Sequence, residues 1–219
     1  MKQKFYVFLD IDGTMWDMKD LRVRKKYVIE MNPESGKALT ILMDSLNLDY
    51  DADLVITSRR RTSWDSCLDF FRFSCYDIDK YNPHMTHLKH VNKPRGVKIA
   101  EYMYNAEKGR DDKHLRFFLK PFEKMYARRI GKKMTSRFVV IDDDMRPISG
   151  ILPNENLIHT NKYVQSLNCE MVESFLKCNN IKIVKQQSED KVLVFEKKPV
   201  KQSETQKTDS NEKEMGADE

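Results

Sequence analysis

The 219-residue chain lacks any apolar run that approaches the roughly 20 residues of a membrane-spanning helix. Its first residues, Met1–Lys4, do not have the pattern that opens a secretory signal peptide. The four cysteines, Cys67, Cys75, Cys169 and Cys178, include no Cys-x-x-Cys pair and no spacing of a disulfide framework. We therefore expect reduced thiols, no membrane partner and a cytoplasmic location, with the nucleus as the alternative.

The chain also lacks an internal repeat, and its length suits one domain with a sizeable core. Residues 201–219 contain three Lys against six Asp or Glu and only one large apolar residue, Met215, so this acidic tail is predicted to be disordered. The remaining 200 residues carry 36 basic and 28 acidic side chains. This basic excess suggests an anionic partner, and a solvated basic face without a partner is the plain alternative.

Strand and helix signals alternate along the chain as they do in βαβ units, which predicts an α/β fold with a central parallel sheet flanked by helices. The predicted strands are Lys4–Leu9, Asp53–Thr57, Phe138–Ile141 and Asn156–His159. The predicted helices are one that starts at Asn32–Pro33 and continues past Leu46, then Trp64–Phe73, Gly96–Tyr104, Leu115–Ile130 and Met171–Leu176. Residues 75–94 are predicted to be a polar loop. We expect a domain over residues 1–184, with Ile181–Val184 pairing with Val192–Phe195, inside 185–200, as a terminal hairpin.

The first predicted strand ends in Asp10-Ile11-Asp12-Gly13-Thr14. Ligands of open α/β sheets bind beyond the carboxyl ends of such strands. The two carboxylates lie two residues apart and point the same way, and Gly13 lets the chain turn away beneath them. Such a pair can hold a divalent cation, or it can divide the labour between a nucleophile and a general acid–base group.

Three further motifs follow in order. Thr57 closes Leu54–Ile56, Lys98 lies near a helix start with Lys93 and Arg95 as substitutes, and Asp142–Asp143 follow the third strand. Together with the first motif they resemble the four motifs of haloacid-dehalogenase (HAD) superfamily phosphatases, over roughly residues 4–180. The resemblance implies a Rossmann-like HAD fold with a small or absent cap, and Mg²⁺-dependent hydrolysis through an aspartyl-phosphate.

The resemblance also implies a role for each motif residue, and the chemistry of the side chains agrees with it. Asp10 would attack phosphorus, and Asp12 would protonate the leaving oxygen and then activate water. Thr57 and Lys98 would donate to the phosphoryl oxygens. Mg²⁺ would be held by Asp10, the backbone carbonyl of Asp12, and Asp142 or Asp143. Asp144 is interpreted as a surface or capping residue.

A narrower resemblance concerns short segments around these motifs. They look like the HAD domain of RNA-repair proteins and the 3′-phosphatase domain of phage polynucleotide kinase, in which an arginine two residues past the second-motif hydroxyl helps to hold phosphate. The segments are Thr57-Ser58-Arg59, Arg95-Gly96-x-Lys98-Ile99, Val139–Asp143 and Leu157-Ile158-x-Thr160. The predicted substrate-binding residues are Arg59, Arg95, Ser58 and Gly13. No kinase P-loop is present, so no 5′-kinase activity is expected within the chain.

Basic residues are grouped around the predicted site. They form the clusters Lys19–Lys26, Arg59–Arg61 and Lys93–Lys98, which would suit a phosphodiester backbone. No long insertion separates Thr14 from Asp53, so an open site is expected. The favoured hypothesis is therefore a phosphatase acting on RNA or DNA ends, with a 3′-phosphate as its substrate. The alternatives are a phosphatase of small monoesters, with residues 100–137 folding over the site as a lid, and a non-catalytic nucleic-acid-binding module.

Two smaller features have two interpretations each. His84, His87 and His90 have the spacing of metal ligands on one helical face, but Pro83 beside them favours an ordinary polar loop. Trp16 can stack on a substrate base or anchor the turn after the first strand to the core, and burial statistics favour the core.

Overall fold

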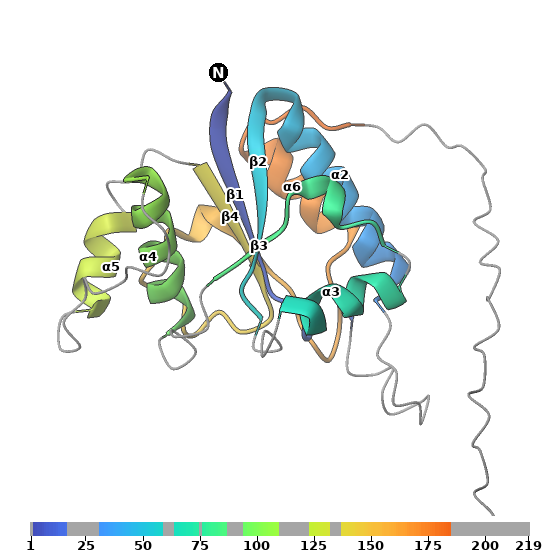
Figure 1. Ribbon diagram of the computed structural model, residues 1–219, viewed down its shortest axis with the longest axis horizontal. Coiled ribbons are helices and arrows are strands. Elements are labelled where there is room, and N and C mark those ends of the chain that lie inside the picture. Colours follow the sequence, from blue (N-terminus) through green and yellow to red (C-terminus); the bar gives the residue numbers. More distant parts are fainter. Residues whose placement is uncertain are drawn as a thin grey trace, which may run out of the picture. The chain divides into compact units, whose positions relative to one another are not determined.

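Five parallel strands form one sheet in the computed structural model, which describes residues 2–16, 31–58, 64–74, 76–86, 94–109, 123–131 and 137–184 (Figure 1). The strands are β1 (Gln3–Leu9), β2 (Tyr50–Ile56), β3 (His84–Met85), β4 (Arg137–Asp142) and β5 (Leu157–His159). Their order is β3-β2-β1-β4-β5, so the chain builds one side of β1 before it crosses to the other. This order gives a switch point between β1 and β4 and is compatible with a Rossmann-like fold.

The central strand β1 is buried on both faces, as expected of a parallel sheet covered by helices. Its residues from Phe5 to Leu9 are at most 6% exposed. Leu9 is level with Ile56 of β2 and with Ile141 of β4 in the strand register. The three central strands therefore end at the same height, and the residues that follow them meet at one edge.

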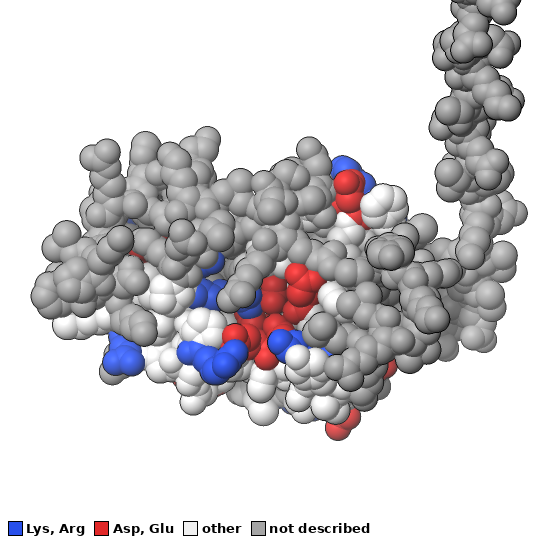
Figure 2. All heavy atoms as spheres, turned by 90° about the horizontal axis from the view of Figure 1, so that it is seen from below, with Lys and Arg blue, Asp and Glu red and all other residues white. Residues whose placement is uncertain are grey.

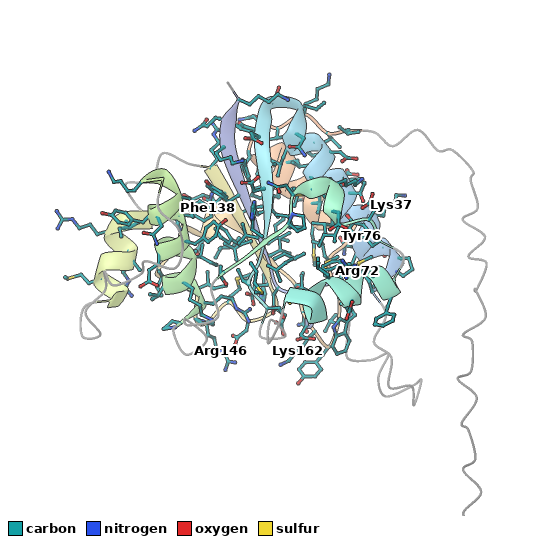
Figure 3. All side chains as sticks on the ribbon, in the orientation of Figure 1. Lys37, Arg72, Tyr76, Phe138, Arg146 and Lys162 are labelled. Carbon is teal, nitrogen blue, oxygen red and sulfur yellow. The ribbon has the colours of Figure 1, made fainter. Side chains whose placement is uncertain are left out.

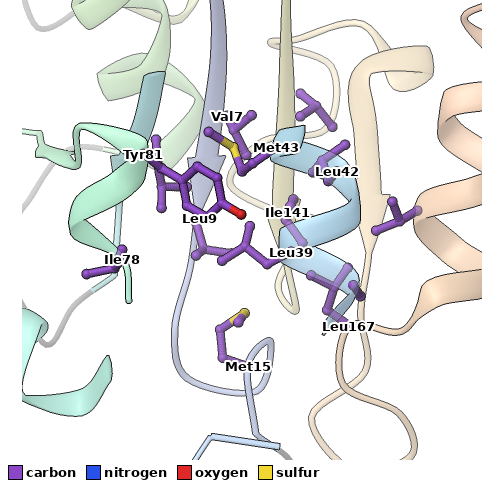
Figure 4. Packing of buried hydrophobic residues seen from close by; sticks show 14 of the residues in the cluster. Val7, Leu9, Met15, Leu39, Leu42, Met43, Ile78, Tyr81, Ile141 and Leu167 are labelled. Atoms are coloured by element: carbon purple, nitrogen blue, oxygen red, sulfur yellow. The ribbon is translucent and has the colours of Figure 1, made fainter. Parts of the chain in front are cut away.

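Helices lie on both faces of the sheet (Figure 1). On one face, α2 (Pro33–Asp49), α3 (Trp64–Phe73) and α6 (Cys169–Cys178) pack with Phe5, Val7 and Leu9. Figure 4 shows part of this core around Val7 and Leu9. On the other face, α4 (Arg95–Glu107) and α5 (Glu123–Gly131) pack with Tyr6 and Phe8. Alternate residues of β1 thus serve two hydrophobic clusters, as the period of two in a strand requires.

The first turn of α2 has the predicted capping residues. The side-chain oxygen of Asn32 accepts a hydrogen bond of 3.0 Å from the amide of Glu34, and Pro33 occupies the first turn, where its missing N–H has no intrahelical partner to lose. Asn168 caps α6 in the same way, accepting from the amide of Met171 at 2.9 Å. Within the described ranges, no helix is both long enough and apolar enough to span a membrane.

The structure differs from the sequence prediction in two places. The segment predicted as a polar loop contains a short 3₁₀ helix, Asp79–Tyr81, and β3, whose residues His84 and Met85 pair with the end of β2. The strand predicted at Ile181–Val184 is wrong, because these residues belong to no strand. The amide of Val184 donates instead to Ser45 Oγ at 3.0 Å, and Ile181 is buried in the main core. The predictions for 115–122, 192–195 and the acidic tail lie outside the described residues.

Candidate functional site

Three of the four sequence motifs meet at the carboxyl edge of the sheet. Hydrogen bonds between neighbouring strands continue past the strand ends, from the amide of Asp10 to the carbonyl of Ile141 at 2.9 Å and from the amide of Thr57 to the carbonyl of Leu9 at 2.8 Å. The amide of Thr160 donates to the carbonyl of Asp142 at 3.0 Å. These bonds hold the residues after β1, β2, β4 and β5 side by side at the switch point.

The carboxylates of Asp10, Asp142 and Asp143 form a cluster at this edge. Each of them offers an oxygen, and these oxygens lie within 4.8 Å of one another. Asp10 is 3% exposed and Asp142 is fully buried. The Oδ1 atom of Asp10 is buried and accepts no hydrogen bond within the described residues. Buried carboxylates this close together need a positive charge between them or a shared proton.

Arg95 supplies a positive charge to this carboxylate cluster from the first turn of α4. Its Nη1 atom lies 3.1 Å from Asp10 Oδ2 and also pairs with Asp142. Burial nevertheless raises the pKa of Asp10 to about 7, because the repulsion from Asp142 and Asp143 adds to the desolvation and the Arg95 charge offsets only part of it. Burial likewise raises the pKa of Asp142 against the opposing charge of Arg95. The cluster is therefore electrostatically strained in its fully ionised form.

Gly13 is the residue on which the close packing of this site depends. Its φ of +76° lies in the left-handed region that favours glycine. A Cβ atom at this position would lie 2.5 Å from Lys162 Cβ and 2.7 Å from Asp143 Oδ2. The absence of a side chain at Gly13 therefore lets the turn after β1 approach Asp143 and the loop after β5.

Asp12 is held by the indole of Trp16. The Nε1 atom of Trp16 donates to Asp12 Oδ1 at 3.2 Å, and the two residues are also joined by a backbone bridge. Trp16 is 5% exposed and belongs to the main core, as predicted, and it also lines the site cavity. Trp16 therefore belongs both to the core and to the wall of the cavity.

Asp144 supports the carboxylate cluster without belonging to it, in agreement with its interpretation as a capping or surface residue. Its amide donates to Asp142 Oδ1 at 2.9 Å, which orients that carboxylate. Its own carboxylate accepts from Arg146 Nε at 2.8 Å, and this hydrogen bond lowers the pKa of Asp144. Arg146 lies at the carboxyl edge of the sheet, as Lys162 does (Figure 3).

A cavity of about 310 Å³ opens at this edge. Acidic side chains gather in its hollow, with basic side chains beside them (Figure 2). Four carboxylates and two basic groups belong to the residues that line it, so two negative charges remain when all of these groups are ionised. The described lining residues are Asp10, Asp12, Gly13, Trp16, Arg95, Asp143, Asp144 and Lys162. A cavity of this charge favours a cation and would repel a phosphate that arrived without one.

The other predicted site residues lie behind or beyond this cavity. Thr57, Ser58 and Lys98 are at most 6% exposed and are not among the lining residues that the structure describes. Lys98 follows Arg95 by one helical turn on α4. Arg59 and the clusters at 19–26 and 59–61 lie outside the described residues, as does Lys93.

The structure describes one of the three histidines whose spacing could suit a metal. His84 lies in β3, and its Nε2 atom is 3.1 Å from the side-chain nitrogen of Asn82. His87 and His90 lie outside the described ranges. In the described part of the chain, the carboxylate cluster at the switch point is the group whose geometry suits a metal ion.

Lys162 is the site residue that sequence reasoning missed. The loop after β5 brings it to the cavity, and that loop is held to the turn after β1 by a contact of 3.1 Å between the hydroxyls of Thr160 and Thr14. These two threonines are 146 residues apart in the chain. The Leu157-Ile158-x-Thr160 segment was the available signal, because it placed the strand end from which the loop starts.

The fold and site together define an α/β protein with a carboxylate cluster and basic residues at the switch point of a parallel sheet. Comparison of the chain with protein-family models, with curated proteins and with solved structures finds no match in any of the three.

Proposed function

We propose that this chain is a Mg²⁺-dependent phosphohydrolase of the HAD type, which acts on the phosphate at the ends of nucleic acids. The observation that carries the proposal is the cluster of Asp10, Asp142 and Asp143 at the switch point. Asp10 and Asp143 line the cavity at this edge, together with Asp12 two residues beyond Asp10. The parallel sheet, the motif order and the side-chain chemistry support the same class.

The residues present fit a magnesium ion. Mg²⁺ takes oxygen ligands and is commonly held by one or two carboxylates together with substrate phosphate. Asp10 Oδ1 is a buried acceptor without a partner in the described structure, and Asp142 and Asp143 offer further oxygens within 4.8 Å. When bound, Mg²⁺ would neutralise this cluster and polarise a phosphoryl oxygen.

The hydrolysis would proceed in two steps on this chain's own residues. In the first step a carboxylate oxygen of Asp10 forms a bond to phosphorus while the ester P–O bond breaks, and Asp12 gives its proton to the leaving oxygen. In the second step Asp12 takes a proton from water, which attacks phosphorus and releases phosphate and the Asp10 carboxylate. Trp16 acts as a positioning residue, because its N–H fixes the orientation of the Asp12 carboxylate.

Basic residues beside the cavity would stabilise the transferring phosphoryl group. Arg95 lines the cavity and pairs with Asp10, so its guanidinium can stabilise the negative charge that develops on the phosphoryl oxygens. Thr57 and Lys98 are buried and are not among the described residues that line the cavity, so their predicted contacts with phosphate need the site to rearrange around the substrate.

The nucleic-acid substrate is favoured by the distribution of positive charge. Lys162 and Arg146 lie at the carboxyl edge in the described structure, and the sequence adds basic clusters beside the first and second motifs. These are more cations than one phosphate needs, and a neighbouring phosphodiester would use them. A small phosphate ester is the competing substrate class, and it predicts no preference for oligonucleotides.

An assay of the full chain with Mg²⁺ tests the proposal on 3′-phosphorylated oligonucleotides, nucleotides and sugar phosphates. We expect phosphate release that is fastest with oligonucleotides, is lost in EDTA and is abolished by Asp10→Asn. Asp53→Asn is the matched control, because Asp53 is also a buried, ion-paired carboxylate, but it pairs with Lys4 away from the site. Activity that survives Asp10→Asn in a folded protein would overturn the proposal.

A further inference from the structure

The loop after β5 projects five residues, 161–165, at the rim of the site cavity. Two backbone hydrogen bonds close its base, from the amide of Asn161 to the carbonyl of Gln165 at 2.9 Å and in return at 2.8 Å. The side chain of Asn161 accepts from the amide of Tyr163 at 3.0 Å, which fixes the turn from inside. The loop is thus a short turn with a defined backbone.

Both ends of this loop are fastened to the turn that carries the first motif. Thr160 Oγ1 lies 3.1 Å from Thr14 Oγ1 and donates to the carbonyl of Gly13 at 3.3 Å. The amide of Leu167 donates to the carbonyl of Thr14 at 2.8 Å. Because Thr14 and Thr160 are fully buried, the loop and the first motif form one rigid substructure.

The tip of this loop presents an aromatic ring and a cation to the solvent. Tyr163 is 52% exposed, although burial of an aromatic ring is strongly favourable. The Nζ atom of Lys162 lies 5.1 Å from the centroid of the Tyr163 ring, in the range of a cation–π contact. Within the described residues, no carboxylate lies within ion-pair distance of Lys162, and Lys162 also lines the cavity.

An exposed ring beside a cation, on a loop with a bonded backbone at the rim of the proposed phosphate site, matches the chemistry of a nucleotide. We propose that the loop 161–165 is a nucleoside-binding element, in which Tyr163 stacks on the base next to the reacting phosphate and Lys162 contacts the adjoining phosphodiester. The inference rests on the proposed function for the position of that phosphate. Stacking on an aromatic side chain tolerates any base, so this element would recognise a strand end without reading its sequence.

A thermodynamic cycle between the ring and the base tests the stacking contact. Binding is measured with the full-length Asp10→Asn protein in Mg²⁺, so that no ligand is consumed. The ligands are two fluorescent 3′-phosphorylated oligonucleotides that differ only in the presence of the base on the last nucleotide. We expect base removal to weaken binding about tenfold when Tyr163 is present, and by less than about twofold in the Tyr163→Ala background. Tyr163→Phe keeps the ring and should keep the tenfold effect.

The Lys162 contact is tested by the salt dependence of the same binding. Lys162→Met should reduce the slope of log affinity against log salt by roughly 0.7, the loss of one phosphate contact on a single strand. Lys108→Ala is the matched control, because Lys108 is an exposed lysine away from the site. It follows the last residue of α4, and the opposite end of that helix, at Arg95, lies at the cavity. The control variant should leave both the affinity and the slope unchanged.

The outcomes separate this inference from the proposed function. Hydrolysis of glycerol phosphate by the wild-type protein, without coupling between Tyr163 and the base, overturns the inference and leaves the phosphatase proposal standing. Coupling without hydrolysis of any phosphate ester supports nucleoside binding by the loop and refutes the phosphatase proposal. Equal weakening of both oligonucleotides by Tyr163→Ala overturns the inference, because the ring would then support the loop and would not contact a base.

Discussion

The strained carboxylate cluster makes a strong prediction about stability in the absence of metal. Asp10 has a pKa of about 7 in the folded protein and an ordinary value of 3.8 when it is unfolded. Between these two values the folded state binds more protons than the unfolded state, so the free energy of unfolding falls as the pH rises. Three pKa units correspond to about 4 kcal/mol, which is lost between roughly pH 4 and pH 7.

Asp10→Asn removes this titration. In EDTA we expect the variant to match the wild type near pH 4 and to be more stable above pH 7, by up to about 4 kcal/mol. Asp142 contributes a slope of the same sign in both proteins, because burial raises its pKa as well. Urea unfolding followed by tryptophan fluorescence at pH 4 to 8 measures both slopes.

Magnesium should reduce the difference in stability between the two proteins. An ion that binds only the folded state stabilises it by about 2.7 kcal/mol at a hundred times its Kd, and the wild type has the fuller ligand set. Asp53→Asn is the control, because it breaks the 2.9 Å pair with Lys4 away from the cluster, and the fall of stability with rising pH that Asp10 causes should persist in it. A wild type whose stability is flat from pH 4 to 8, and which Asp10→Asn does not stabilise, would refute this account of the site.

Three further predictions concern single residues. Asp12→Asn should lower the turnover rate by about 10²- to 10⁴-fold, while calorimetry still detects Mg²⁺ binding. Asp142→Asn should instead weaken Mg²⁺ binding itself, and the opposite pattern would contradict the assigned roles. Gly13→Ala should destabilise the fold by about 1–3 kcal/mol in urea unfolding, because its Cβ would overlap Lys162 Cβ at a positive φ, and unchanged stability would contradict the close packing. Arg95→Met should lower the free energy of unfolding by about 3–5 kcal/mol in EDTA, and by less with saturating Mg²⁺, because the ion replaces the lost charge. An equal loss in both conditions would be evidence against that replacement.

The sequence predicted the frame of the sheet because its central strands are buried on both faces. Continuous apolar runs such as Tyr6–Leu9 and Val139–Ile141 are too short for a helix, and each stops at an acidic residue, so both indicate buried strands. The start of α2 was equally clear, since Asn32 and Pro33 form a local signal that needs no tertiary contact. The prediction that the first, second and fourth motifs meet followed from the shared edge of parallel strands.

The failures share a dependence on distant contacts. β3 has only two residues, and its assignment as a strand depends on pairing with Val55 and Ile56. Ile181–Val184 has the apolar pattern of a strand, but Ser45 on α2 takes the amide that a strand would have used. Lys162 reached the site through contacts between segments 146 residues apart, which no local pattern records.

The bonds between the first motif and the loop after β5 also set how this part of the molecule should open. The carbonyl of Thr14 accepts a hydrogen bond from the amide of Leu167, and its hydroxyl contacts the hydroxyl of Thr160. Neither the first motif nor the loop after β5 can therefore move away without breaking bonds to the other. Their amides should therefore exchange with deuterium as one cooperative unit, at a rate slower than that of ordinary surface loops. The candidate site, which needs both the turn after β1 and the loop after β5, would thus come apart in a single opening event.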